Sequence, residues 1–288
     1  MATTPPEDAV ISTYRVSTIT TNGSVGAEVN FAAVFVELPI LDTEKPGDGF
    51  LFAKMVDDKG TLLVRGVNPR ERARRHRAGA NGASCFINQT TVVYRYGTQT
   101  PNIKIFASGN LHLTGVKNVD DGQRIVDRVV DALRDIPGAT RFPDATLKNR
   151  DYLVRMINVD FAVEGWGINR GRLYAALQVS RPALMCVYES NTYQALKVHY
   201  YFNASKIVQD GYCNCYADQT VQCSGKGKGD VATSCKRVTL SIFGTGKMMI
   251  IGASSMEQVD HVYAFVKQML PEHFKAVRVP LQAKRAKA

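Results

Sequence analysis

The stretch IKIFASGNLHLTGVK at residues 103–117 occurs a second time, in altered form, as LSIFGTGKMMIIGAS at residues 240–254. The copies begin 137 positions apart, and at that offset identical residues fall at Ile105/Ile242, Phe106/Phe243, Gly109/Gly246 and Gly115/Gly252. In the first copy, two alternating segments flank the pair Ser108-Gly109, which predicts two strands joined by a tight turn. A hairpin that recurs at a fixed offset indicates that the chain is internally duplicated.

The duplication extends to both sides of the hairpins. Residues 121–133 and 256–270 each have apolar side chains at helical spacing, which predicts an amphipathic helix. Upstream, residues 14–38 match residues 152–177 at an offset of 138 that drifts to 139. Each half is therefore predicted to consist of a strand, a short helix, several strands and a long helix.

The repeats divide the chain into segments. Proline, glycine and a charged run mark the connection between the halves. The predicted segments are a disordered lead at 1–13, a first repeat at 14–138 with a basic loop at about 65–80, a connection at 139–151, a second repeat at 152–275 with a Cys/Gly-rich insert at about 204–235, and a basic tail at 276–288.

This order of elements, with an IF-x-(S/T)-G-x4-(T/I)-G phrase in each half, resembles the TATA-binding protein (TBP) family. Within it, the chain resembles the TBP-like proteins of nucleocytoplasmic large DNA viruses. Further matching features are Met156-Ile157-Asn158, Tyr188-Glu189 before Tyr193, and Cys235-Lys236-Arg237-Val238-Thr239 after the insert. The resemblance implies an α+β fold, a TBP-like saddle whose tandem pseudo-symmetric repeats form a curved antiparallel β-sheet with helices on the convex face.

The resemblance also implies a way of binding DNA. In the TBP family the sheet lies in a widened minor groove, and four aromatic side chains wedge into base steps and kink the duplex. The implied wedges in this chain are Phe86, Phe106, Tyr193 and Phe243. Tyr193 departs from the family, because its hydroxyl makes a less apolar wedge. A lone phenylalanine before a glycine turn is usually a core residue, but duplication and family position favour a DNA-facing role.

Other side chains should share the face that carries the wedges, because neighbours two positions apart on a strand point the same way. The predicted DNA contacts are Lys104, His112 and Thr114 in the first half, Ser241, Met249 and Ile251 in the second, and Asn158 near the dyad with Thr20 or Thr18 as its counterpart. Lys104 and His112 are unexpected, because the family uses small apolar and threonine contacts here. They are predicted to read acceptor atoms or to reach phosphates.

Composition favours a polyanionic partner. The chain has 36 Lys+Arg against 26 Asp+Glu and a formal net charge of +10, which favours neutralisation of DNA phosphates. Basic residues concentrate in two places, the loop that includes Arg65 and Arg70, and the tail with Lys284, Arg285 and Lys287. Each is interpreted either as a solvated segment or as extra phosphate contact or a nuclear import signal. No apolar stretch approaches the ~20 residues of a membrane span.

Four cysteines suggest a second kind of site. Cys213, Cys215, Cys223 and Cys235 have the spacing C-x-C-x7-C-x11-C in a loop rich in glycine and lysine. Four thiolates can hold a structural zinc ion. Disulfides and free thiols are the alternatives, and no other cofactor is expected.

Enzymatic function finds no support in the sequence. The five histidines form no HExxH pair, no nucleophile elbow is present, and residues 224–229 do not complete a phosphate-binding loop. The resemblance to the TBP family leads us to predict a non-enzymatic viral transcription initiation factor that binds and bends A·T-rich promoter DNA in the minor groove as a monomer. The resemblance implies a transcription factor IIB-like factor and RNA polymerase as partners. It also implies action in the nucleus or a cytoplasmic viral factory of the infected cell, with packaging in the virion as a further option.

Two other classes stay open. One is a structural or virion protein that binds DNA without sequence preference. The other is a protein-interaction module whose concave sheet binds a polypeptide.

Overall fold

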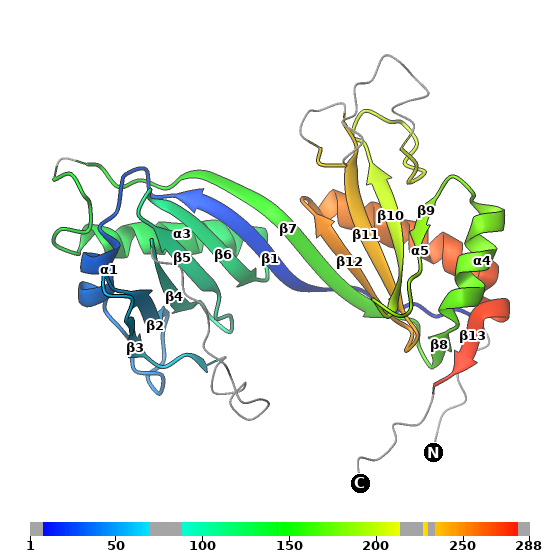
Figure 1. The fold of residues 1–288 in the computed structure, drawn as a ribbon, viewed down its shortest axis with the longest axis horizontal. Helices are drawn as coiled ribbons and strands as arrows, with labels where there is room; N and C mark the ends of the chain where they lie inside the picture. The colour runs from blue at the N-terminus through cyan, green and yellow to red at the C-terminus, as the bar shows by residue number, and fades with distance from the viewer. Residues whose placement is uncertain (1–7, 70–87, 144, 214–226, 230–233, 282–288) are drawn as a thin grey trace, which may run out of the picture. The chain divides into compact units, whose positions relative to one another are not determined.

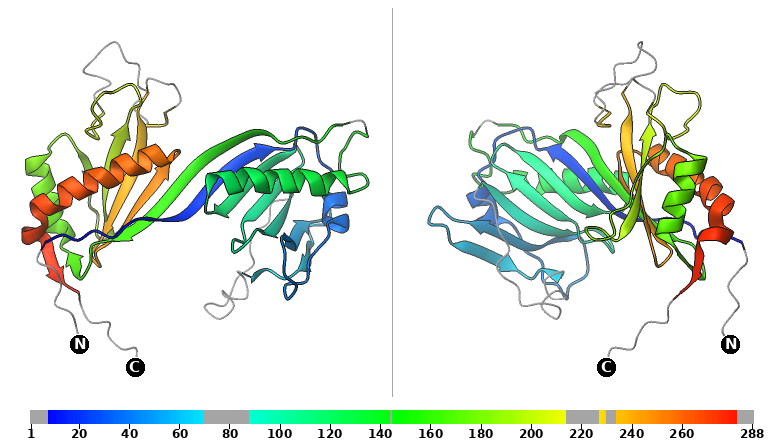
Figure 2. Two further views of the ribbon diagram at one scale, coloured as in Figure 1. Left: turned by 180° about the vertical axis from the view of Figure 1, so that it is seen from behind. Right: turned by 45° about the vertical axis from the view of Figure 1, so that its right-hand side comes forward.

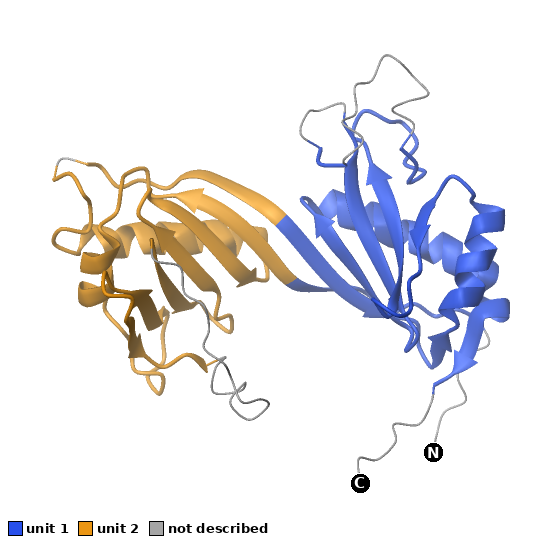
Figure 3. Ribbon diagram, in the orientation of Figure 1, with its two compact units in different colours: residues 1–17, 156–288 blue, residues 18–155 orange. Residues whose placement is uncertain are grey.

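The computed structural model describes residues 8–69, 88–143, 145–213, 227–229 and 234–281 (Figure 1). The chain forms two compact units (Figure 3). Unit 1 comprises residues 1–17 and 156–288, and unit 2 comprises residues 18–155. Each unit has an antiparallel sheet with helices on one face, so the α+β class predicted from the sequence is confirmed.

Unit 2 is built from the first repeat. Its strands lie in the order β3-β2-β4-β5-β6-β1. Their bounds are β1 Arg15–Ser24, β2 Gly49–Val56, β3 Leu62–Gly66, β4 Gln89–Arg95, β5 Asn102–Phe106 and β6 Asn110–Val116. The helices are α1, Phe31–Glu37, and α3, Val119–Arg134, and α3 lies across one face of the sheet (Figure 2).

Unit 1 repeats this arrangement with the second half of the chain. Its strands lie in the order β7-β12-β11-β10-β9, with β13 and β8 as a separate pair. Their bounds are β7 Arg150–Ala162, β8 Trp166–Ile168, β9 Met185–Val187, β10 Ala195–Phe202, β11 Lys236–Phe243, β12 Lys247–Ala253 and β13 Arg278–Pro280. The helices are α4, Arg170–Ser180, and the long α5, Met256–Val277.

Both predicted hairpins are confirmed, and their turns are built alike. Gly109 and Gly246 have φ angles of 79° and 78°, the left-handed region that glycine enters without a steric penalty. The carbonyl of Gly109 accepts a hydrogen bond from Val25 N at 2.9 Å, and that of Gly246 accepts from Val163 N at 3.0 Å. Each turn is therefore closed by the segment that follows the first strand of its repeat.

The two short helices begin at equivalent asparagines. Asn30 Oδ1 accepts from Ala33 N at 3.2 Å, and Asn169 Oδ1 accepts from Arg172 N at 3.0 Å. An asparagine at this position satisfies one of the unpaired N–H groups of the first helical turn. The pair aligned by the duplication thus performs the same capping role twice.

The core of each unit lies between the sheet and its long helix. On β5, Ile103 and Ile105 are fully buried, while Lys104 and Phe106 are half-buried. The alternation predicted from the sequence is therefore present, with the isoleucines toward α3 and the other side chains on the opposite face. α3 buries the residues that its helical spacing marked, namely Ile125, Val129, Val130 and Leu133.

α5 is longer than the predicted residues 256–270, because it continues through Pro271 to Val277. Proline inside a helix removes one backbone hydrogen bond and usually kinks or ends it. Here Phe274 and Val277 lie beyond the proline and are buried. Their burial continues the packed face of α5 beyond the proline, which local sequence rules do not anticipate.

The first strand of each repeat begins in the unit formed by the other repeat. Tyr14 precedes β1 but belongs to unit 1, where its hydroxyl donates to Asp260 of α5 at 2.6 Å. This hydrogen bond, with burial, raises the pKa of Tyr14 to about 12. Tyr152 lies in β7 but belongs to unit 2, where its hydroxyl donates to Val119 O of α3 at 2.8 Å. The aligned tyrosines thus play the same role in the two repeats. Each attaches the start of its own repeat's first strand to the long helix of the other repeat.

Arg65 corrects the expected basic loop. It lies in β3, where its guanidinium donates to the carbonyl oxygens of Phe35 and Val36 at the end of α1. Cationic donors at a helix C-terminus satisfy carbonyls that lack helical partners. Arg65 therefore has a structural contact, and Arg70 with the rest of the basic run lies outside the described residues.

Among the described helices, none has the length and apolarity needed to cross a membrane.

We expect Gly109→Ala and Gly246→Ala to destabilise the protein more than Gly138→Ala. A Cβ at Gly109 would lie 1.9 Å from Ala27 O, and one at Gly246 would lie 2.2 Å from Trp166 O. Gly138 has φ of 68° but nothing within 4 Å, so it should cost only the ~1–2 kcal/mol of a left-handed residue. The overlap should add roughly 1–3 kcal/mol, measured by urea unfolding. Equal losses at all three sites would contradict this close packing.

Candidate nucleic-acid interface

In each unit, the candidate site lies on the sheet face opposite the long helix, here called the open face. On the hairpin of unit 2, Lys104, Phe106, His112 and Thr114 are all half-buried, and the residues between them in each strand are buried. On the hairpin of unit 1, Phe243, Met249 and Ile251 are half-buried in the same way. The structure therefore places these predicted residues together on one face of each unit.

A row of polar side chains crosses the open face of unit 2. The cross-strand register pairs Lys54 with Thr91, Thr91 with Lys104, Lys104 with His112, and His112 with Asn22. Directly opposed residues on adjacent strands have neighbouring side chains. This arrangement, the unit 2 row, therefore brings two lysines and a histidine from strands far apart in the sequence onto one surface.

A hydrogen-bond chain ends the unit 2 row. With its amide oxygen toward Arg155, Asn22 accepts from Arg155 Nε at 3.0 Å and donates to His112 Nδ1 at 2.8 Å. Burial lowers the pKa of His112, and the nearby charge of Lys104 lowers it further. A neutral imidazole that accepts at Nδ1 carries its proton on Nε2. The unit 2 row thus presents hydrogen-bond donors at Lys104, His112 and Arg155.

Unit 1 has a matching row of different chemistry. The register pairs Val187 with Lys197, Lys197 with Ser241, Ser241 with Met249, and Met249 with Asp160. This arrangement, the unit 1 row, ends in an ion pair of 3.0 Å between Asp160 Oδ2 and Arg15 Nη2. Asp160 occupies the position of Asn22, and Met249 occupies that of His112. The unit 1 row is therefore more apolar and contains a carboxylate.

A groove adjoins each of the two described wedge phenylalanines, Phe106 and Phe243. The groove in unit 2 has a volume of ≈ 500 Å³ and is lined by Phe106, Asn22, His112 and Arg155, among others. The groove in unit 1 has a volume of ≈ 580 Å³ and is lined by Phe243, Asp160, Met249 and Arg15, among others. In each groove, the arginine comes from the exchanged first strand of the other repeat.

The rings of two predicted wedge residues, Tyr193 and Phe243, lie in contact. Their ring centroids are 6.1 Å apart with an interplanar angle of 62°, an edge-to-face arrangement that aromatic pairs favour. Lys197 Nζ lies 4.3 Å from the Tyr193 centroid, within the range of a cation–π contact. Phe86, the predicted partner of Phe106, lies outside the described residues.

The residues predicted near the dyad occupy equivalent positions, but they differ in exposure. Thr20 is paired with Thr114 and is 8% exposed. The 138-residue offset aligns Thr20, rather than Thr18, with Asn158. Asn158 is half-buried, and its Oδ1 accepts from Gly252 N at 3.2 Å. Ser241 belongs to the unit 1 row but is only 1% exposed, so its neighbours cover it.

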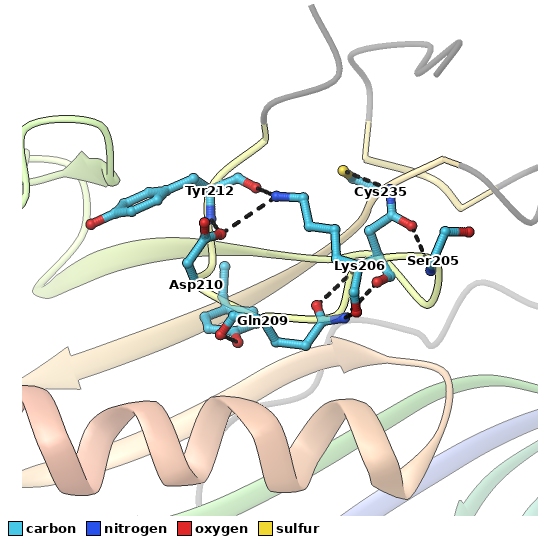
Figure 4. Close-up of polar contacts among 8 residues, drawn as sticks. Ser205, Lys206, Gln209, Asp210, Tyr212 and Cys235 are labelled. Atoms are coloured by element: carbon cyan, nitrogen blue, oxygen red, sulfur yellow. Dashed lines mark hydrogen bonds and ion pairs between the residues drawn. The ribbon is translucent and has the colours of Figure 1, made fainter. Parts of the chain in front are cut away.

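The start of the cysteine-rich insert is a tightly hydrogen-bonded loop (Figure 4). Asn203, at its first turn, donates from Nδ2 to Cys235 Sγ at 3.8 Å. Gln209 accepts from Asn203 N and donates to the carbonyl oxygens of Asn203 and Lys206. Lys206 Nζ donates to Tyr212 O at 2.7 Å. The loop therefore fixes the environment of the buried Cys235 thiol.

The zinc prediction concerns residues that the structure describes only in part. Cys213 and Cys235 are described and form no disulfide, whereas Cys215 and Cys223 lie outside the described residues. Within the described ranges, no three His, Cys, Asp or Glu residues form a group that could hold a metal ion. The four-cysteine site therefore stays a prediction.

Comparison with known proteins supports the resemblance seen in the sequence. No protein-family model matches the chain. A curated TATA-box-binding protein-like protein of Acanthamoeba polyphaga mimivirus is 24% identical over 218 residues. The chain is similar to this viral TBP-like protein. The match covers 68% of the chain and 51% of the relative, so the chain spans about half the length of the curated relative that it matches.

A likeness is also found among solved structures. The TBP of Methanococcus jannaschii has a TM-score of 0.47 and 14% sequence identity to this chain. The superposition covers 91% of this chain and 99% of that chain.

Sequence reasoning missed Asn22, Asp160, Arg15 and Arg155, and also the lysines Lys54 and Lys197 of the two rows. Asn22 and Asp160 lie two positions after Thr20 and Asn158, so period-two counting along the same strands would have found them. The two arginines gave no such signal. Each faces its acceptor across a pair of strands that are distant in the sequence.

We expect His112 to titrate below the usual histidine pKa of ~6.5, because burial and Lys104 both disfavour the imidazolium. Lys104→Met should raise this pKa only part of the way, since burial is the larger cause. As pH falls below ~6.5, the unfolded chain binds this proton first, so the free energy of unfolding should decrease until the folded pKa is passed. NMR titration of the imidazole and urea unfolding against pH measure these two effects.

Lys54→Met is the matched control for this titration. It removes the same charge from the unit 2 row three strands away from His112, roughly 14 Å at the usual strand spacing. Screening at physiological salt weakens interactions beyond ~8 Å, so the pKa of His112 should barely move. A His112 pKa at or above 6.5, or an equal response to both lysines, would show that this electrostatic assignment is wrong.

Proposed function

We propose that the chain is a DNA-binding transcription initiation factor that holds promoter DNA against its open faces and bends it. The observation that supports this best is the repeated placement of Phe106 and Phe243. Each lies half-buried at the same hairpin position, on the open face, beside a groove and an arginine. Apolar wedges flanked by cations match the chemistry of a protein that unstacks and kinks a duplex.

The open faces supply both parts of such an interaction. Lys54, Lys104 and Lys197 lie in the two rows and provide positive charge toward phosphates. The phenylalanines provide apolar surface that replaces base stacking at the kink. Unstacking costs a few kcal/mol per step, so the polyelectrolyte contribution of the cations has to offset that cost. Flexible TA steps lower the cost and should be preferred at the kinks.

The remaining parts of the proposal rest on the resemblance. We propose that a transcription factor IIB-like factor and RNA polymerase bind to the complex of the protein with the bent duplex. The protein acts as a monomer with two pseudo-equivalent halves. It acts in the nucleus or a cytoplasmic factory of an infected cell. A zinc ion held by Cys213, Cys215, Cys223 and Cys235 would stabilise the insert. No catalytic step belongs to this function.

Energy transfer between dyes at the two ends of an A·T-rich duplex tests the proposal. Titration with the protein should raise the transfer efficiency, since a kink shortens the end-to-end distance. The double variant Phe106→Ala/Phe243→Ala should reduce the bend and weaken binding by ~10-fold or more, because two large apolar contacts are lost. The measurement is made at physiological salt, with a fluorescence anisotropy titration alongside it.

Phe142→Ala is the matched control for the wedges. Phe142 is 57% exposed and lies in the connection after α3, so its removal should leave bending unchanged. Equal binding of A·T-rich and G·C-rich duplexes without bending would replace the proposal by a DNA coat protein. Failure to bind any duplex at low salt would favour a protein-interaction module.

A further inference from the structure

Asp160 is an unusual residue for a face that binds DNA. The sheet of unit 1 consists of β9–β12 and the part of β7 from Met156 onward. Among the described residues of these strands, Asp160 is the only acidic one. Its side chain is 35% exposed and lines the groove beside Phe243. A carboxylate at this position repels phosphates, so a plain cationic surface would not contain it.

One of its oxygens is already engaged. Asp160 Oδ2 accepts from Arg15 Nη2 at 3.0 Å, and the side chain of Arg15 is 80% exposed. A carboxylate has about four lone-pair sites and accepts without donating. Oδ1 has no hydrogen-bond donor within the described residues. Asp160 therefore presents an acceptor without a protein donor to whatever enters this groove.

Minor-groove chemistry gives that acceptor a specific partner. A·T and T·A pairs expose only acceptors in the minor groove, whereas a G·C pair adds the guanine N2 amine, which is a donor. An acceptor pressed against acceptors leaves a desolvated charge without a partner, which is costly. A guanine amine would instead donate directly to Asp160.

The equivalent position in unit 2 has the opposite character. Asn22 has its oxygen occupied by Arg155 and its amide nitrogen directed to His112. The surrounding groups, Lys104, His112 Nε2 and Arg155, are donors. They match the acceptors of A·T pairs, and a guanine amine beside them would meet only other donors.

We propose that the two grooves read different base pairs, with Asp160 selecting a G·C pair through the guanine amine and the Asn22 groove selecting A·T pairs. This inference rests on the proposed function, since it requires minor-groove binding by the open faces. A difference between the two grooves would give the bound protein a defined orientation along the DNA. A half-site with one G·C pair under unit 1 and an A·T-only half-site under unit 2 would orient the protein on a promoter.

Base analogues isolate the amine from the rest of the base pair. Inosine·C lacks the N2 amine of G·C, and 2,6-diaminopurine·T adds one to A·T. Duplexes carrying one such substitution at each successive position are titrated with wild-type protein by anisotropy. We expect one position at which G·C binds more tightly than inosine·C, on the order of tenfold. Diaminopurine·T should be preferred over A·T at the same position.

Two variants of Asp160 separate charge from hydrogen bonding. Asp160→Val should abolish the difference between G·C and inosine·C at that position. Asp160→Asn keeps an acceptor and should retain part of the difference while raising affinity for all duplexes. Asp131→Asn on α3, where Asp131 is paired with Arg134, is the control for a lost surface charge and should leave the difference intact.

The alternative outcomes are distinguishable. Equal binding of G·C and inosine·C at every position, with Asp160→Val raising all affinities uniformly, would show that the carboxylate only neutralises Arg15 and would overturn the inference. The proposed function would survive that result. No binding of wild-type protein to any duplex would overturn both.

Discussion

The antiparallel register of the strands is the constraint on which the candidate site depends. Side chains alternate between the two faces, so a slip of one residue would move Phe106 into the core and Ile105 onto the open face. The hairpin turns fix this register, because Gly109 and Gly246 accept backbone hydrogen bonds from Val25 and Val163. A chain segment outside each hairpin thereby holds the turn in place. The position of the turn then determines which side chains of the hairpin lie on the open face.

The exchange of first strands gives this duplicated fold a property that neither repeat has alone. Arg15 reaches Asp160, and Arg155 reaches Asn22, from the first strand of the other repeat. Each groove is therefore completed by a residue from the opposite half of the sequence. Tyr14 and Tyr152 hold the same exchanged ends against α5 and α3.

Duplication has preserved backbone geometry while the side chains on the open faces diverged. The capping asparagines, turn glycines and buried helix positions are equivalent in both units. In contrast, the residues at equivalent open-face positions differ. Lys104 aligns with Ser241, His112 aligns with Met249, and Asn22 aligns with Asp160. The helix-facing side is held by close packing, in which small volume changes are costly. On the open side, Lys104, His112 and Met249 are only half-buried, so packing constrains these positions less.

The sequence by itself determined the repeats, the hairpins, the long helices and the shared face of Phe106, Lys104 and His112, because these follow from local periodicity and from comparison of the two copies. It did not determine that α5 continues past Pro271, that Arg65 caps α1, or that an arginine lies beside Asn22 and Asp160. Those features depend on burial and on contacts across strands that are distant in the sequence. Only the tertiary structure sets such pairings, since register between distant strands is fixed by the whole packed sheet rather than by any local pattern.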